Sequence, residues 1–291
     1  MLKSKISVVG YEENGKTLLG DSYHNAPYKI IHYGSKNLRD HLEMIMMCAS
    51  PGMMEGDELD IDVEVNKSAQ MRLYTQSFSK IHPTGDVGAV QRMNVRIQEK
   101  GLFHFIPHPV TPFHDSTFRT TNTIHMQPDS TLIWGDIIAS GRVHVGESFD
   151  FNLLHSVTKI YRGKKLIVMD NQRLTPKKHN LQSILYYEGF THQATLIYVS
   201  PFGDLLKEEL DEILAGQYQE ITFGFTQCAP DAVMIRAMGN DGELLYEWLS
   251  EMGRLCWSFT QFQLEQEKKL QQEVLEPMDD AETALKDQAY A

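Results

Sequence analysis

The chain has 291 residues, a formal net charge of −12 and a pI of about 5.4. Proteins that bind phosphate backbones or anionic lipids usually present basic surfaces, so this charge argues against nucleic acid or a membrane surface as the partner. Three scattered cysteines without a CxxC pair indicate a reducing compartment. The sequence shows neither a signal peptide nor an apolar run of about 18 residues, so we predict a cytoplasmic protein without a membrane span.

The first 200 residues are predicted to be rich in β-strands. Residues Asp60–Val65 alternate polar and apolar side chains without a break, and Met93, Val95 and Ile97 alternate with polar neighbours, as half-buried strands do. Further runs of β-forming residues are Met71–Phe78, Leu102–Ile106, Thr131–Trp134, Phe149–Leu153, Ser156–Tyr161, Leu166–Met169 and Thr195–Val199. Strands at intervals of about ten residues are typical of a sandwich, a barrel or a β-solenoid. No sequence unit repeats, so any solenoid must be irregular.

Two segments are predicted to be helical. Asp204 is a suitable N-cap for a helix over Leu205–Ala215, with Gly216 as its stop. Apolar residues spaced three and four apart predict a longer helix over about residues 243–262. We therefore expect a β-rich body, a helical and mixed part packed on the same domain, and a charged extended tail, at residues 1–200, 201–262 and 263–291.

Residues Gly10–Thr17 match the pattern of a phosphate-binding P-loop letter for letter. Such a loop requires a following helix whose N-terminus faces the phosphates, and no helical stripe occurs before Pro27. Two glutamates inside the loop would also repel phosphate. Asn14-Gly15 is instead a strong signal for a type I′ hairpin, which we predict here. A nucleotide hydrolase built around Lys16 is thus the weakest functional hypothesis.

His104, His108 and His114 suggest a metal site, because the first two would share one face of a strand. Three prolines nearby argue against a regular strand there, and no HExxH, paired HxH or zinc-finger spacing occurs. No GxSxG elbow or protease-like cysteine is present either. We therefore predict no catalytic residue and no tightly bound cofactor. An enzyme acting on polysaccharides, built on a β-helix or sandwich with paired acids, is the alternative hypothesis.

Several short sequence segments resemble the UreD family of urease accessory proteins, also called UreH. They occur in consistent order between about residues 27 and 260. These segments are Pro51–Asp57, Tyr74–His82, Phe105–Phe113, Trp134–Ile137, Gly141-Arg142, Gly146–Phe149, Asp170-Asn171 and Gly189–His192. The sequence differs from the family pattern at Pro51, where a glycine is common, and at Asp136, where many relatives have glutamate. The tail after about residue 262 has no counterpart in the family. The resemblance implies a mainly β fold, an irregular β-helical or solenoid-like arrangement of many short strands with a small C-terminal helical part.

The resemblance also implies a function. It implies a protein that is not an enzyme, that assembles with UreF and the GTPase UreG on apo-urease, and that lets Ni²⁺ pass through an internal tunnel toward the urease centre. We expect the same partners here, in a dimer of heteromers. Carboxylates hold such an ion more loosely than imidazole or thiolate, as transit requires. The acids expected to line the passage are Glu55, Asp57, Asp136, Glu147 and Asp170. The alternative roles are a turn for Asp57 and an ion pair with Arg142 for Glu147.

Overall fold

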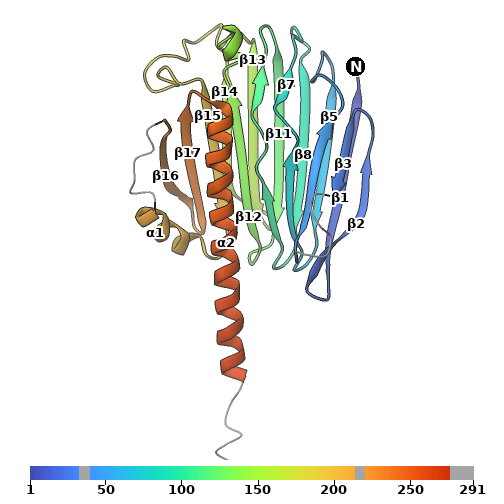
Figure 1. The fold of residues 1–291 in the computed structure, drawn as a ribbon, viewed down its shortest axis with the longest axis vertical. Helices are drawn as coiled ribbons and strands as arrows, with labels where there is room; N and C mark the ends of the chain where they lie inside the picture. Colours follow the sequence, from blue (N-terminus) through green and yellow to red (C-terminus); the bar gives the residue numbers. More distant parts are fainter. Residues whose placement is uncertain (33–39, 214–219, 276–291) are drawn as a thin grey trace, which may run out of the picture.

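The computed structural model describes residues 1–32, 40–213 and 220–275, and two β-sheets that face each other dominate it (Figure 1). The seven-stranded sheet has the order β14 (Lys165–Leu174), β13 (Leu153–Arg162), β11 (Thr117–Met126), β8 (Ala89–Ile97), β5 (Glu58–Val65), β1 (Lys3–Glu13) and β2 (Lys16–His24). The ten-stranded sheet has the order β16 (Thr222–Ala229), β17 (Ala232–Gly239), β15 (His192–Val199), β12 (Thr131–Ala139), β9 (Leu102–Phe105), β6 (Gln70–Thr75), β4 (Leu42–Cys48) and β3 (Tyr28–His32). Its short strands β7 (Ser79–Ile81) and β10 (Val110–Pro112) pair beside this path.

The central strands form a β-solenoid of about four coils. Strands β5, β8, β11 and β13 pair in parallel in one sheet, and β4, β6, β9 and β12 pair in parallel in the other. The chain therefore crosses from sheet to sheet within each coil. Antiparallel hairpins, β1 with β2 and β13 with β14, end the seven-stranded sheet at its two edges. The predicted mainly β, solenoid-like fold is confirmed.

Local sequence patterns account for many of these strands. The alternation of Asp60–Val65 lies in β5, where every second side chain is buried between the sheets. The turn at Asn14 and Gly15 has φ angles of 55° and 78°, which fits a type I′ hairpin joining β1 to β2, so Gly10–Thr17 is not followed by the helix that a P-loop needs. The strand predicted at Phe149–Leu153 is wrong, because Phe149 has a left-handed φ of 59° and β13 begins only at Leu153.

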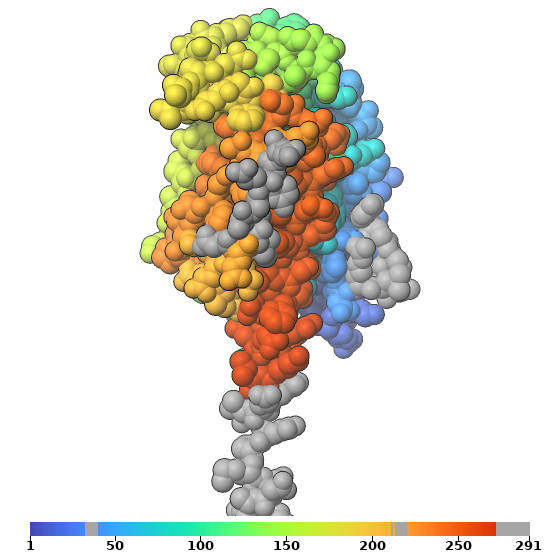
Figure 2. Space-filling view, turned by 60° about the vertical axis from the view of Figure 1, so that its left-hand side comes forward, coloured from blue at the N-terminus to red at the C-terminus, as the bar shows by residue number. Residues whose placement is uncertain are grey.

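The apolar side chains form two cores. One fills the space between the sheets, and the other lies between the outer face of the ten-stranded sheet and the helices α1 (Gly203–Ile213) and α2 (Gly242–Leu275). Helix α2 contacts β12, β15 and β17, and Figure 2 shows its far end standing clear of the body. Both predicted helices are present, but α1 begins at Gly203, so Asp204 lies in its first turn rather than at its N-cap. The predicted end of this helix, residues 214–216, lies outside the described residues.

Helix α2 is longer than its apolar stripe. It continues through the charged residues 263–275, which belong to the expected tail, and residues 276–291 lie outside the described part of the chain. The stripe sets which part of the helix is packed, because Leu245, Leu249 and Cys256 are fully buried whereas Phe262 and Leu270 are exposed. A charged helix end can persist without packing when it propagates from a packed segment.

Gly253 lets α2 approach the sheet closely. A Cβ at this position would lie 2.2 Å from Ile106 Cδ1 and 2.8 Å from His104 Nε2. We expect Gly253→Val to lower the free energy of unfolding by about 1–3 kcal/mol, because the added atoms overpack the interface between helix and sheet. Urea denaturation measures this loss. Ser258→Val, at an exposed position of the same helix, is the control and should cost less than about 1 kcal/mol; equal losses would mean that only helix propensity is being measured.

Candidate functional site

A row of polar side chains crosses the interior face of the seven-stranded sheet. The strand registers place Gln91 opposite Thr120, Thr120 opposite Ser156, and Ser156 opposite Gln172. A parallel row one pair further along the strands consists of Asn122, Thr158 and Asp170. Because each residue comes from a different strand, these two rows run along the solenoid axis, perpendicular to the strands.

The ten-stranded sheet carries a matching row on its interior face. Asp136 on β12 lies opposite Thr195 on β15, which lies opposite Arg236 on β17. Neighbours in strand register share one face of a sheet, and the flanking residues Trp134 and Ile138 belong to the core between the sheets. The two sheets therefore present polar groups to each other through an otherwise apolar core. We call these three rows together the polar row.

Hydrogen bonds connect the polar row across the interior. Ser156 Oγ donates to Asp136 Oδ2 at 3.2 Å, and Arg236 Nη2 donates to Asp170 Oδ1 at 2.6 Å. Gln172 Nε2 donates to the other oxygen of Asp170 at 3.0 Å. These contacts bring together two of the five acids expected from the sequence, Asp136 and Asp170. They also fix the Asp170 carboxylate with two donors.

Asp136 has an unusual protonation equilibrium. Burial raises the pKa of its carboxyl group to about 6, with a smaller contribution from the charge of Asp170, while the Ser156 hydrogen bond acts in the opposite direction. Burial also raises the pKa of the nearby Tyr187, with a smaller contribution from the charge of Asp136. Near neutral pH, Asp136 is thus an anion between the two sheets, with no cation in direct contact among the described residues.

Several polar atoms in or next to the polar row have no hydrogen-bond partner within the described residues. These buried atoms are Thr120 Oγ1, Trp134 Nε1 and Tyr187 Oη. A buried polar group without a partner costs free energy unless water or a ligand supplies the missing bond. Thr120 and Trp134 line a small cavity together with Asp136, so water or a ligand in that cavity can supply bonds that the chain does not.

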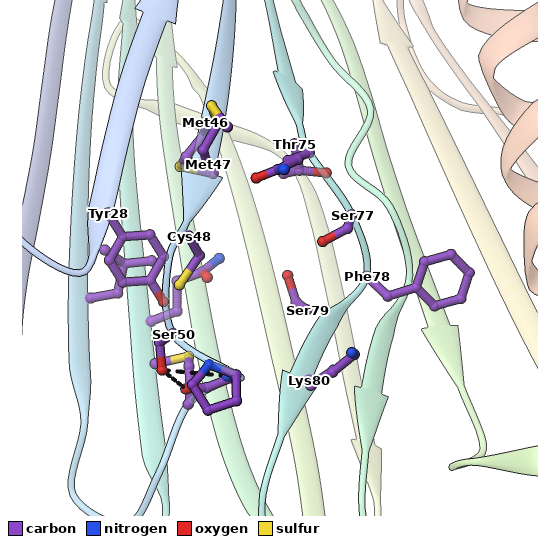
Figure 3. A pocket seen from close by; sticks show the side chains of 16 residues that line it. Tyr28, Met46, Met47, Cys48, Ser50, Thr75, Ser77, Phe78, Ser79 and Lys80 are labelled. Carbon is purple, nitrogen blue, oxygen red and sulfur yellow. Dashed lines mark hydrogen bonds between the residues drawn. The ribbon is translucent and has the colours of Figure 1, made fainter.

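Cavities lie next to the polar row on both sides. A cavity of about 130 Å³ beside β4 and β6 shares Met46, Thr75, Ser79 and Gln91 with a second one of about 40 Å³, which is lined by Asp136. Figure 3 shows the first cavity, with Ser77 and Ser79 across from Tyr28 and Cys48. A third, more open cavity of about 460 Å³ is lined by Gln193 and Arg236. The polar row lies between the second and the third cavity.

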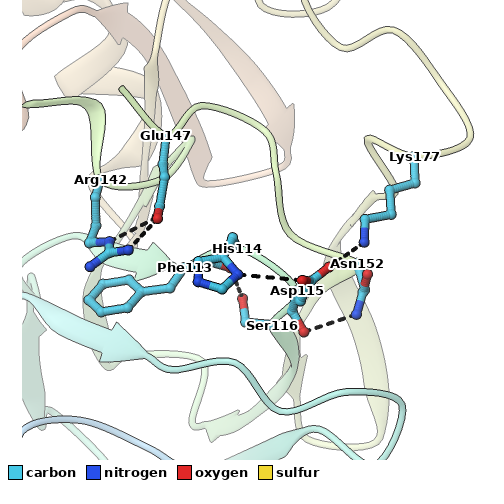
Figure 4. A network of polar contacts seen from close by, with 8 residues as sticks. All are labelled: Phe113, His114, Asp115, Ser116, Arg142, Glu147, Asn152 and Lys177. Carbon is cyan, nitrogen blue, oxygen red and sulfur yellow. Dashed lines mark hydrogen bonds and ion pairs between the residues drawn. The ribbon is translucent and has the colours of Figure 1, made fainter. Parts of the chain in front are cut away.

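The other three expected acids lie away from this interior. Asp57 is buried, and its carboxylate accepts hydrogen bonds from the backbone N–H groups of Leu2 at 2.8 Å and Met54 at 2.9 Å, the turn role considered for it. Glu55 is exposed. Glu147 forms an ion pair with Arg142 beside the 3-10 helix Val143–Val145, as Figure 4 shows.

Two of the three histidines considered for a metal site, His104 and His108, pack against α2, whereas the exposed His114 lies beside Asp115. His104 is buried with its ring edge-on to Trp257, and burial lowers its pKa to about 3. His108 stacks on Tyr246 at 3.9 Å between ring centroids and shares a hydrogen bond with Thr75. Across residues 1–32, 40–213 and 220–275, no three His, Cys, Asp or Glu side chains gather closely enough to hold a metal ion. The rings at 104 and 108 thus serve the contact between helix and sheet.

No described helix combines the length and apolar character needed to cross a membrane. Together, fold and site define a class of protein, a β-solenoid scaffold with acidic and polar groups along its axis. Comparison with known protein families identifies the particular family. A family model described as UreD urease accessory protein matches residues 3–271. The chain therefore belongs to the UreD family of urease accessory proteins, which are non-catalytic scaffolds in urease maturation.

Individual relatives agree with this assignment. The chain is 35% identical over 244 residues to the urease accessory protein UreD of Acetivibrio thermocellus, covering 84% of this chain and 93% of that protein. It is 30% identical over 256 residues to UreD of Flavobacterium johnsoniae, covering 87% and 92%. It is 32% identical over 262 residues to the urease accessory protein UreH of Helicobacter pylori strain J99, covering 89% and 94%.

Proposed function

We propose that this chain serves urease maturation by conducting Ni²⁺ through its interior along the polar row. The single observation that supports this most is the alignment of Asp136, Thr195 and Arg236 opposite Ser156 and Gln172. An apolar core between the sheets would have been more stable, because each buried carboxylate costs desolvation free energy. A row of such groups in register across successive coils fits the passage of an ion along the solenoid axis.

The chemistry of the row suits a passing ion rather than a bound one. Two carboxylates, several hydroxyls and amide oxygens are hard, exchangeable ligands for a divalent ion, and nitrogen or sulfur sites hold Ni²⁺ more tightly. The cavity at Asp136, about 40 Å³, has room for an ion or about one water molecule. We assign transient nickel contacts to Asp136 and Asp170, and no ion contact to Glu55, Asp57 or Glu147.

The proposed partners are UreF, the GTPase UreG and the urease apoprotein, in a dimer of heteromers. The family membership supports urease-related partners, and the relatives are themselves described as urease accessory proteins. Because Gly10–Thr17 forms a hairpin, the nucleotide chemistry of the assembly belongs to the GTPase in this proposal. In this proposal the chain provides the passage for Ni²⁺, and its partners provide the nickel and hydrolyse GTP.

The polysaccharide-acting alternative has less support. Its paired acids would have to meet a polymer in an open groove, whereas Asp136 lines a cavity of about 40 Å³ between the sheets. A sugar residue does not fit a space of this size.

Reconstitution tests the proposal. Purified apo-urease is incubated with UreF, UreG, GTP, Ni²⁺ and bicarbonate, with or without this chain, and urease activity and bound nickel are measured. We expect nickel-dependent activity only when the chain is present. Equal activation in its absence, at nickel concentrations too low for spontaneous loading, would contradict the proposed role in delivery.

A further inference from the structure

Arg236 occupies the boundary between the polar row and the most open of the three cavities. Its side chain is 42% exposed and lines the cavity of about 460 Å³, together with Gln193 and Tyr187. Its guanidinium reaches inward to Asp170, at 2.6 Å, whose side chain is only 12% exposed. The arginine thus has its charged end in the interior and free space on its outer side.

The charges around this position add up to a site for one positive ion. Asp136 and Asp170 carry two negative charges when ionised, and Arg236 supplies one positive charge within the same row. With the guanidinium in place, a divalent ion would give the group a net charge of +1, whereas with the guanidinium withdrawn the ion neutralises both acids. In a poorly solvated interior, the neutral arrangement is strongly favoured over the charged one.

We infer that Arg236 is the resident counter-ion of the passage, and that a divalent ion enters the Asp136–Asp170 pair by displacing its guanidinium outward into the neighbouring cavity. This inference rests on the proposed function and adds to it the residue that keeps nickel binding weak. Without such an internal cation, the two acids would hold Ni²⁺ more firmly and release it more slowly.

The surrounding contacts permit this exchange. Gln172 Nε2 holds Asp170 Oδ2 at 3.0 Å, and Gln193 Nε2 in turn holds Gln172 Oε1 at 3.0 Å, so the carboxylate keeps its place when the guanidinium leaves. Arginine has a long side chain with several rotatable bonds, and strand β17 need not move.

Nickel binding by single variants of the full chain tests the inference. Equilibrium dialysis with NiCl₂ at pH 7.5 should show about tenfold tighter binding for Arg236→Gln than for the wild type, because the competing charge is gone while amide donors remain. Arg236→Lys, which keeps a cation, should stay within about threefold of the wild type. Asp170→Asn combined with Arg236→Gln should lose the added affinity.

A matched control is Arg162→Gln, which removes the guanidinium that bonds Asp231 at 2.9 Å. This ion pair lies outside the polar row, so nickel affinity should not change. Circular dichroism and thermal melting confirm that each variant is folded. Equal nickel affinities for Arg236→Gln and wild type would overturn the inference, as would the same gain for Arg162→Gln.

A second measurement uses the unaltered protein and so does not depend on a variant that folds. Phenylglyoxal modifies exposed guanidinium groups, and mass spectrometry reports the modified fraction at Arg236. Added NiCl₂ should increase modification at Arg236 severalfold and leave Arg162 unchanged; protection or no change at Arg236 would contradict displacement. If Arg236 fails both tests while Asp136→Asn still blocks urease activation, only the inference fails. If Asp136→Asn leaves activation intact, the proposed function itself fails.

Discussion

Asp136→Asn is expected to lower nickel-dependent activation of urease by about tenfold or more in the reconstituted assembly, because it removes a carboxylate ligand from the middle of the polar row. The substitution is nearly isosteric, and an asparagine oxygen at this position can still accept the hydrogen bond that Ser156 donates. Assembly with the partner proteins should therefore persist. Activity per mole of assembled complex is the quantity to compare.

The same substitution should stabilise the protein at neutral pH. The pKa of Asp136 is raised to about 6 in the folded chain, so the folded state binds a proton more strongly than the unfolded state. The stability that this proton contributes is present below about pH 4 and is lost as the pH rises through about 6. At pH 7.5, Asp136→Asn should thus raise the free energy of unfolding by up to about 3 kcal/mol, and at pH 4 the gain should vanish.

Asp62→Asn is the control for both effects, since Asp62 lies on the outer face of β5 and makes surface contacts with Lys5 and Asn94. It should change activation and stability little. A stabilised but inactive Asp136→Asn variant separates function from folding. An Asp136→Asn variant that activates urease like the wild type would exclude this acid from nickel transit.

Asp57→Ala is expected to act in the opposite way, through stability alone. Removing the carboxylate leaves the N–H groups of Leu2 and Met54 without their acceptor and weakens the start of β1, which pairs with β5 from Lys3 onward. A loss of about 2–4 kcal/mol in the free energy of unfolding follows from two charge-assisted hydrogen bonds at a part-buried turn. Urea denaturation followed by fluorescence measures it.

The contrasting variant is Asp62→Ala on the neighbouring strand, which should cost less than about 1 kcal/mol. Once folded, Asp57→Ala should deliver nickel at the wild-type rate per folded molecule at a temperature well below its melting point. A delivery defect in fully folded Asp57→Ala would return this acid to the set of proposed ion contacts.

The sequence contains enough information for most of the fold. The alternation in Asp60–Val65 is visible because one face of β5 is buried and the other is solvated. Strand β11 escaped prediction for a physical reason, since its inward positions include Thr120 and Asn122 and so blur the contrast between the two faces. The exposed end of α2 was not predicted as helix, because beyond Phe262 it lacks the apolar stripe on which the prediction relied.

The candidate site depends on register, which a single sequence does not reveal. Gln91, Thr120 and Ser156 are unremarkable polar residues, and only strand pairing shows that they share one line across successive coils. The family resemblance suggested five acids, of which the structure places Asp136 and Asp170 in the polar row and the other three elsewhere. No sequence pattern marks Arg236 as part of the site, because its proposed role depends on its contact with Asp170 on the other sheet.

Anomalous diffraction from crystals equilibrated with NiCl₂ tests the central claim most directly, because it locates the ion without relying on activity. A nickel peak between the carboxylates of Asp136 and Asp170, with the Arg236 side chain turned toward the cavity beside β16, is the expected result. Nickel found only on surface histidines, with the polar row still closed by its own hydrogen bonds at saturating metal, would contradict an interior route.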